Sequence, residues 1–193
     1  MEYKANFNSK ETMEQIRIQN PTWDHYPGIW YSGATPKFTF VTWLSAKNRL
    51  STGDRMERWN CNAHTGCSFC SEPKETRDHL FFLCPFTKEI WNNLVGGTRK
   101  QSFTVVWEEI MIWIIKPPYD NITTFLLRYT LHTAIYHIWC ERNNRRHKET
   151  PVDQKRLKKM IDVTVKNRIS SLRELGRKKY GEGLTTWFAT RTT

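Results

Sequence analysis

The sequence predicts a mainly α-helical protein, in which a small helical module precedes a long antiparallel helical hairpin. Apolar residues recur at helical spacing along much of the chain, and this periodicity indicates amphipathic helices. Prolines and glycines separate the periodic segments and mark their boundaries. The chain has 193 residues, which is long enough to bury a hydrophobic core, and its sequence contains no internal repeat.

The first expected helix covers residues 38–50, with Pro36 near its start, where the fixed φ angle of proline is favourable. Its apolar side consists of Phe40, Trp43, Leu44 and Leu50. Residues 51–54, with the sequence Ser-Thr-Gly-Asp, are expected to end this helix. A short helix through residues 55–59 then leads to a cysteine-rich segment.

The cysteine-rich segment contains potential metal ligands with the spacing C-x2-C-x8-H-x4-C. They are Cys67, Cys70, His79 and Cys84. Thiolate and imidazole are ligands that zinc prefers, and a C-x2-C turn supplies two of them from one place in the chain. Four protein ligands leave no open position for a substrate or an activated water. We therefore expect one structural Zn²⁺ that stabilises the small helical module.

Other interpretations of the cysteines remain open. The thiols could be free and buried beside an unrelated histidine, because cysteine is often a core residue. Cys61 or His64 could replace one of the four ligands, since zinc sites vary in spacing. Disulfides are not expected, because the cysteine count of five is odd and the polar N-terminus lacks a signal-peptide core. Cys140, within an apolar helical pattern, is expected in the core.

Two more helices are expected between the cysteines and the hairpin. Pro85 is favourable at a first helical position and opens a helix that ends at Gly96-Gly97. Ser102 is expected to cap a helix over residues 103–115, which two prolines close. The longest unbroken apolar stretch, residues 111–115, is too short to cross a bilayer, so no membrane partner is expected.

The hairpin is expected after these prolines. Apolar residues at helical spacing predict one helix over residues 121–147 and a second, capped by Thr150, that extends to Gly176. Two amphipathic helices joined by a short turn are expected to pack antiparallel. Residues 177–193 are expected to form a loose tail.

Positive charge is concentrated in the second half of the chain. The formal net charge is +11, of which residues 1–100 contribute +3 and residues 101–193 contribute +8. The stretch from Arg142 to Lys179 contains 14 basic and 4 acidic side chains. Such a density is typical of a phosphate-binding surface, although most charge runs are only solvated helix faces. The nine tryptophans could supply rings that stack on bases.

Several strings around the four ligands occur together and in order. They are Pro36-Lys37-Phe38, the run from Asn48 to Met56, Trp59, the C-x2-C pair, the run from Glu75 to Pro85, and Ile90-Trp91. In this combination residues 8–95 resemble the zinc-binding domain that follows the reverse transcriptase in plant LINE-type, or non-LTR, retrotransposons. Cys67, Cys70, His79 and Cys84 occupy the four ligand positions of that family. Residues 101–176 resemble, less specifically, the basic helical extension of its stand-alone members.

The resemblance implies a zinc module that helps to hold RNA or DNA and is not itself the polymerase. The sequence contains no Tyr-x-Asp-Asp string, so it lacks the carboxylate pair that nucleotide transfer requires. A Cys/His nucleophile is not expected either, because a zinc-bound thiolate is not free to attack. We expect no small-molecule substrate. We expect an intracellular location, with the nucleus favoured over the cytoplasm by the basic run.

The candidate nucleic-acid contacts are basic side chains near the zinc module and in the hairpin. They are Arg49, Arg55, Arg58, Lys74, Arg142, Arg145, Arg146, Lys148, Lys155, Arg156, Lys158 and Lys159. Trp59 or Phe69 could stack on an exposed base, although the core is the commoner place for such rings. Two other functions remain open: a zinc-stabilised module that binds a protein partner, or a retroelement remnant with no selected role.

Overall fold

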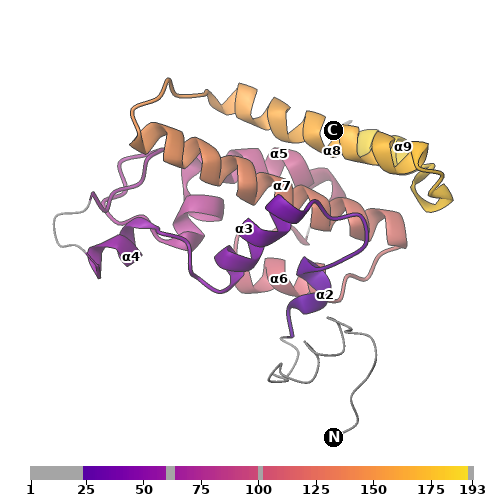
Figure 1. Ribbon diagram of the computed structural model, residues 1–193, viewed down its shortest axis with the longest axis horizontal. Helices are drawn as coiled ribbons and strands as arrows, with labels where there is room; N and C mark the ends of the chain where they lie inside the picture. The colour runs from indigo at the N-terminus through magenta and orange to yellow at the C-terminus, as the bar shows by residue number, and fades with distance from the viewer. Residues whose placement is uncertain (1–23, 60–63, 100–101, 191–193) are drawn as a thin grey trace, which may run out of the picture.

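The computed structural model describes residues 24–59, 64–99 and 102–190. Within these residues every regular element is a helix and there is no strand, so the prediction of a mainly α-helical fold is confirmed. Figure 1 shows an elongated molecule in which α7 (Asn121–Arg146) runs through the centre and the other helices surround it.

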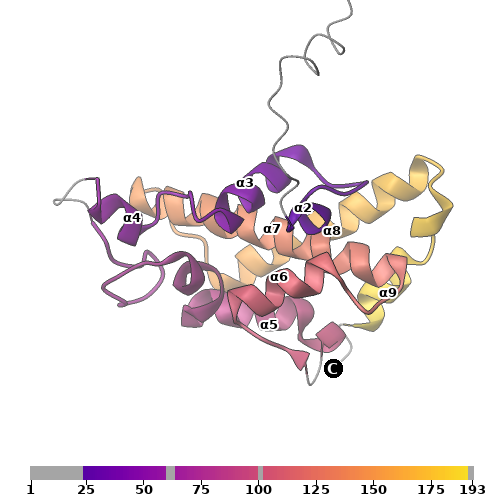
Figure 2. The same ribbon diagram turned by 90° about the horizontal axis from the view of Figure 1, so that it is seen from below.

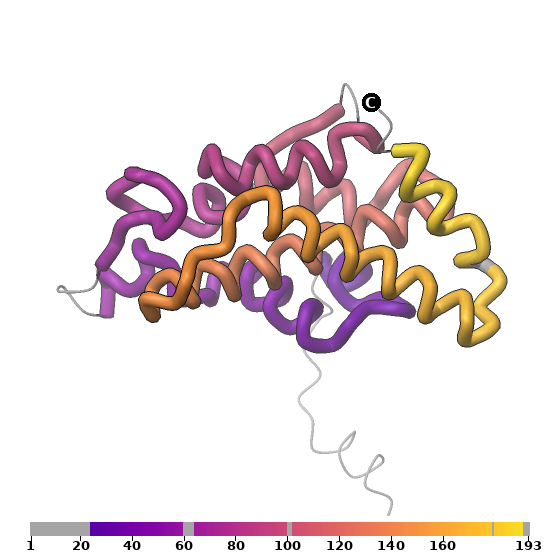
Figure 3. Tube along the Cα trace, turned by 90° about the horizontal axis from the view of Figure 1, so that it is seen from above, coloured from indigo at the N-terminus to yellow at the C-terminus, as the bar shows by residue number. Residues whose placement is uncertain are grey.

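Helices α7 and α8 (Gln154–Glu174) form the predicted antiparallel hairpin. Figure 3 shows them side by side along most of their length. The buried residues of α8 are apolar and follow the predicted helical spacing: Leu157, Ile161, Val165, Ile169 and Leu172. Helix α7 ends one residue before the predicted end at His147, after its last turn reaches the cysteine-rich segment.

The start of α8 differs from the prediction. Asp153, and not Thr150, is its N-cap, because the Asp153 carboxylate accepts a hydrogen bond of 2.7 Å from the backbone N–H of Arg156. A carboxylate at this position satisfies a free N–H group of the first turn and interacts favourably with the helix dipole. Thr150 therefore lies in the connection between the two helices.

Helix α3 (Pro36–Ala46) begins at the predicted proline but ends before Leu50, because Asn48 has a left-handed φ of +50°. Of its predicted apolar side, Trp43 and Leu44 pack partly buried against the core, whereas Phe40 is 52% exposed. The buried residues are Phe38, Thr39, Thr42 and Ser45. These side chains are mostly small, so α3 can lie close against α7, and the Thr42 hydroxyl donates to the Phe38 carbonyl within the helix.

Helix α2 (Tyr26–Ile29) lies between α3 and α6 (Trp107–Ile115), as Figure 2 shows. Helix α4 (Gly53–Glu57) begins two residues before the predicted start at position 55. Gly53 is required there, because a Cβ atom at this position would lie 2.0 Å from the carbonyl oxygen of Thr65. The glycine thus permits α4 to pack against the cysteine-rich segment.

Helix α5 (Pro85–Arg99) continues through Gly96-Gly97, where the sequence predicted its end. A Cβ atom at Gly97 would lie 1.9 Å from the Thr190 carbonyl oxygen, so this glycine serves the close approach of the C-terminal segment. Ser102 does not cap α6, which begins at Trp107. The preceding residues are mostly β-branched, which favours an extended chain, and the Trp91 indole donates to the carbonyl of Thr104.

The prediction of a loose tail from residue 177 is wrong for the described residues. The chain forms η3 (Lys178–Tyr180) and α9 (Gly183–Ala189), and Figure 3 shows it turning back after α8. Trp187 is 2% exposed, and its indole N–H donates to the Asp162 carboxylate over 2.9 Å. Trp187, Tyr180 and Leu184 pack in one apolar cluster with residues of α7 and α8 and so dock the segment on the hairpin.

One hydrophobic core joins the predicted zinc module to the predicted extension. Its members include Ile29, Phe81 and Trp91 from the first part of the chain and Ile135 and Ile161 from the hairpin. The helical extension is therefore packed on the module and shares its core. Among the described residues, none of the helices combines the length and the apolar character that a membrane span requires.

Candidate metal centre

Residues 64–84, here called the zinc loop, bring the four predicted ligands together. The loop closes on itself through two backbone hydrogen bonds, from Cys67 N–H to the Glu72 carbonyl (2.9 Å) and from Glu75 N–H to the Thr65 carbonyl (2.8 Å). The chain then forms the π-helical turn η1 (His79–Leu83), whose apolar residues Leu80, Phe81 and Phe82 are buried. This burial fixes His79 and Cys84 at the two ends of the turn.

The ligand atoms of Cys67, Cys70, His79 and Cys84 all lie within 4.8 Å of one another. The sulfur atoms of Cys67 and Cys84 are 3.9 Å apart, and the Cys70 sulfur is 3.2 Å from Nε2 of His79. Zinc–sulfur bonds of about 2.3 Å in a tetrahedron place two sulfur atoms about 3.8 Å apart. Three sulfurs and one imidazole therefore fit one tetrahedral Zn²⁺, with no protein ligand to spare.

The protonation of these groups also suits a metal ligand set. The hydrogen bond from the Cys67 thiol to Cys84 lowers the pKa of Cys84, and the same bond, together with burial, raises the pKa of Cys67. Zinc binds thiolates, so a zinc ion bound here would displace the protons of these sulfurs. Burial lowers the pKa of His79, so its ring is neutral near pH 7 and its nitrogen lone pair is available.

The other candidate ligands do not join this cluster. Cys61 lies outside the described residues. His64 is exposed and is not among the four converging groups, although its backbone carbonyl has a separate structural role. Cys140 lies on α7, half-buried rather than fully buried in the core as predicted.

The zinc loop is attached to the last turns of α7 by Arg142, Arg145 and Arg146, here called the arginine clamp. Nε and Nη2 of Arg142 donate to one carboxylate oxygen of Glu75 over 2.9 and 2.6 Å. Their side chains are 3% and 0% exposed, so this is a buried ion pair. Arg142 also donates to the Ser51 carbonyl over 2.8 Å. One guanidinium group therefore joins α7, the zinc loop and the chain before α4.

The other two clamp residues bind further along the loop. Arg145 pairs with Glu141 and donates to the carbonyl groups of Ser68 and Val152. Arg146 donates to the carbonyl groups of His64 and Gly66, and it also contacts Glu75. The carbonyl groups of His64, Gly66 and Ser68 belong to a part of the zinc loop without regular structure. The clamp therefore supplies hydrogen bonds that a helix would otherwise provide.

The clamp changes the interpretation of three predicted nucleic-acid contacts. Arg142 is 2% exposed and its guanidinium is paired with Glu75, so little of it is presented to solvent. The charges of Arg145 and Arg146 are likewise engaged with loop groups. Glu75 and Glu141, which bind the clamp, were not among the predicted site residues. Each lies beside a basic residue in the sequence, and no local pattern indicates that it is buried.

The remaining predicted contacts are accessible to different degrees. Arg49, Arg58, Lys74, Lys148, Lys155, Arg156 and Lys159 are exposed. Arg55 and Lys158 are half-buried, and the Arg55 guanidinium lies 5.2 Å from the centre of the Trp59 ring. The Trp59 ring itself is 62% exposed. Phe69 stacks on Phe86 at 4.8 Å and is covered by Arg145, so its ring is not free to receive a base.

Comparison with known families agrees with the geometry. Residues 7–91 match the family described as zinc-binding in reverse transcriptase, and all four converging ligands lie inside this range. The predicted resemblance to a reverse transcriptase zinc-binding domain is thereby confirmed, and with it the expectation of one structural Zn²⁺. The relation to plant LINE-type elements stays a prediction. Neither the curated proteins nor the solved structures give a match.

Proposed function

We propose that this reverse-transcriptase-type zinc module binds nucleic acid without catalysing a reaction, and that the α7–α8 connection and the first turns of α8 supply most of the binding charge. We further infer an origin in a LINE-type retrotransposon and a nuclear location, where such a binding activity would act. The zinc ion holds the loop in shape, and the hairpin presents the phosphate contacts.

The charges of two neighbouring segments support these separate roles for the zinc loop and the hairpin. Residues 49–84, which include the zinc loop, contain five basic and five acidic side chains. Residues 142–159, here called the basic elbow, contain eight basic and two acidic side chains. A phosphate backbone is attracted by net positive charge. The neutral zinc-bearing segment is therefore not the main source of attraction, whereas the adjacent elbow is.

The observation that carries the proposal is the exposure of basic side chains on the elbow beyond those used by the clamp. Lys148, Lys155, Arg156 and Lys159 are all exposed. Figure 1 shows the zinc loop, α4 and the α7–α8 connection at the same end of the molecule. The clamp fixes the elbow against the zinc loop, so these charges lie on a rigid support and lose less entropy when a strand binds.

The donor set supports a role without catalysis. The Cys70 sulfur and the His79 ring nitrogen are only 3.2 Å apart, a distance that would suit a thiol and its base. Both groups, however, belong to the converging four-residue cluster. A thiolate bound to zinc is not a free nucleophile, and a zinc ion with four protein ligands has no position for a water molecule.

Fluorescence anisotropy with labelled single-stranded RNA and DNA tests the proposal. The affinity of the zinc-loaded chain should fall as salt rises, because phosphate contacts release counterions. Replacing Lys155, Arg156 and Lys159 together by alanine should reduce the salt slope by about two to three, since each phosphate contact contributes about one. An affinity that is independent of salt, or unchanged in the triple variant, would contradict the proposal.

A protein partner is the second candidate function, and the outer side of α3 favours it. Phe40 is 52% exposed on this side, and its ring lies 5.8 Å from that of Trp43, which packs partly buried against the core. Exposed aromatic rings of this kind often mark a protein contact. Partner capture that persists after nuclease treatment and is lost in Phe40→Ala would support this function. Retention on RNA or DNA alone would instead support the first.

A further inference from the structure

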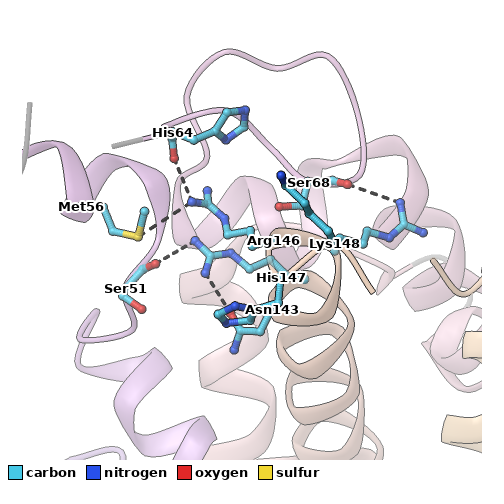
Figure 4. A pocket seen from close by; sticks show the side chains of 10 residues that line it. Ser51, Met56, His64, Ser68, Asn143, Arg146, His147 and Lys148 are labelled. Atoms are coloured by element: carbon cyan, nitrogen blue, oxygen red, sulfur yellow. Dashed lines mark hydrogen bonds between the residues drawn. The ribbon is translucent and has the colours of Figure 1, made fainter. Parts of the chain in front are cut away.

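A concave pocket of about 790 Å³ lies where the last turn of α7 meets the zinc loop. Helix α4 contributes Met56 to its walls, and the zinc loop contributes His64 and Ser68. The end of α7 contributes the arginine clamp, His147 and Lys148 (Figure 4). Pockets of about 300–1,000 Å³ hold small ligands, so this one has room for a nucleotide.

The charge of the pocket wall favours an anion. Among the described residues no carboxylate lines the pocket. The three clamp arginines share two carboxylates, Glu75 and Glu141, which leaves one positive charge, and Lys148 adds a second. A nearby Zn²⁺ with three thiolates would carry a charge of −1 and would offset only part of this excess. A phosphate group is therefore attracted to the wall.

The donors of the wall are already ordered. Arg146 donates to the His64 carbonyl over 2.8 Å and Arg145 to the Ser68 carbonyl over 3.3 Å, as Figure 4 shows. Nε of Arg146 is buried and has no hydrogen-bond partner in the part of the chain that the structure describes, so Arg146 contributes its positive charge to the wall while its Nη groups stay bound to the loop. Lys148 is exposed at the same pocket, in a left-handed conformation with φ of +62°. An incoming anion thus meets fixed guanidinium groups and one mobile ammonium group.

We propose that this pocket binds one unpaired nucleotide of a single-stranded nucleic acid, with its phosphate on the exposed Lys148, in the positive field of the clamp, and its base against Met56 and the ring of His64. The inference rests on the proposed nucleic-acid function and narrows it to single strands. The stacked bases of a duplex cannot enter a concave pocket, whereas an unpaired nucleotide can turn out of its strand. A thioether and an imidazole ring offer the polarisable surfaces that a base requires.

Two variants and one matched control test this inference on the full, zinc-loaded chain. Lys148→Ala and His64→Ala remove side chains of the pocket and leave the backbone carbonyl of residue 64 for the clamp. Lys178→Ala removes the same charge from an exposed site on η3, at the other end of the molecule. The probes are AMP, inorganic phosphate and a labelled single strand of about 12 nucleotides.

In the wild-type chain, AMP should shift the amide resonances of residues around 64 and 148 in ¹H–¹⁵N spectra, and inorganic phosphate should do so more weakly. Each pocket variant should lose the AMP shifts and raise the Kd for the single strand about fivefold or more, whereas Lys178→Ala should leave both unchanged. Lys148→Ala should also reduce the salt slope by about one.

Different failures identify which proposal is wrong. If the wild-type chain binds the strand but AMP shifts nothing, and Lys148→Ala behaves like Lys178→Ala, the pocket is overturned and the proposed function stands. If inorganic phosphate competes as well as AMP, the contact with the base is overturned. If the wild-type chain does not bind the strand at any salt concentration, the proposed function itself fails and the pocket fails with it.

Discussion

The zinc loop and the α7–α8 hairpin pack against each other, but different interactions order them. Residues 64–76 contain neither helix nor strand, and the converging ligands and the arginine clamp hold them in place. Helix α8, by contrast, buries an unbroken apolar stripe and requires no ligand. The difference shows that metal coordination and buried ion pairs replace a hydrophobic core where a segment has little apolar surface to bury.

Removal of zinc should have the largest effect and should separate the two regions. Structural zinc contributes about 10–16 kcal/mol of apparent binding free energy in small zinc modules near pH 7. We expect chelation, or the variant Cys84→Ser, to abolish the protection of residues 64–84 against hydrogen exchange. The hairpin should keep most of its protection, because its own stripe is apolar. Hydrogen exchange with mass spectrometry measures both segments in one experiment.

Cys140→Ser is the matched control for this prediction, since it removes a thiol from α7 outside the ligand cluster. It should leave zinc stoichiometry at one per chain in native mass spectrometry, whereas Cys84→Ser should lower it. A zinc loop that stays protected after complete chelation would show that the clamp alone orders it.

The contrast also explains what the sequence alone could predict. The hairpin and the ligand spacing were predictable, because helical periodicity and C-x2-C turns are local patterns. The bond between Arg142 and Glu75 joins residues 67 positions apart, and no local pattern indicates it. Gly97 likewise resembled a helix end, although its role is to admit the carbonyl of Thr190. The ion pair of Arg142 and the role of Gly97 both depend on contacts between segments that are far apart in the sequence.

Breaking the clamp should have the next largest effect. Glu75→Ala leaves the Arg142 guanidinium buried without its carboxylate partner, which costs about 3–5 kcal/mol of unfolding free energy in comparable sites. The neighbouring variant Lys74→Ala breaks an exposed pair with Glu57 and should cost less than about 1 kcal/mol. Urea denaturation of both zinc-loaded variants measures the difference.

A double variant sharpens this prediction. Glu75→Leu combined with Arg142→Met replaces the buried pair by apolar groups of similar size and should recover part of the loss, because the buried Arg142 charge is then removed, while Arg146 still lacks its contact with Glu75. Equal unfolding free energies for Glu75→Ala and Lys74→Ala would mean that the clamp does not stabilise the loop.

The hairpin should respond to a change in its apolar stripe and not to zinc. Ile169 is fully buried in an apolar cluster without zinc-loop residues, and Ile169→Ala should cost about 2–5 kcal/mol through lost burial and a residual cavity. Val163→Ala, on the exposed side of the same helix, should cost well under about 1 kcal/mol. Thermal unfolding followed by circular dichroism measures both. If chelation changed the cost of Ile169→Ala severalfold, the two regions would not be ordered independently.

The smallest expected effect is a pH dependence inside α7. Burial, with a contribution from Arg128, lowers the pKa of His132 to about 3, so the folded chain favours the neutral ring. The unfolded chain takes up a proton near pH 6.5. This part of the stability is therefore complete above pH 6.5 and is lost as the pH falls from 6.5 toward 3, by about 1 kcal/mol between pH 6.5 and 5.5.

Zinc ligands also protonate in acid, so the measurement compares urea denaturation of the wild-type chain with that of His132→Leu over this range. In the variant, the unfolding free energy should no longer fall with pH through His132, but it should still fall through the protonation of the zinc ligands. Identical slopes would show that His132 does not stay neutral in the folded chain.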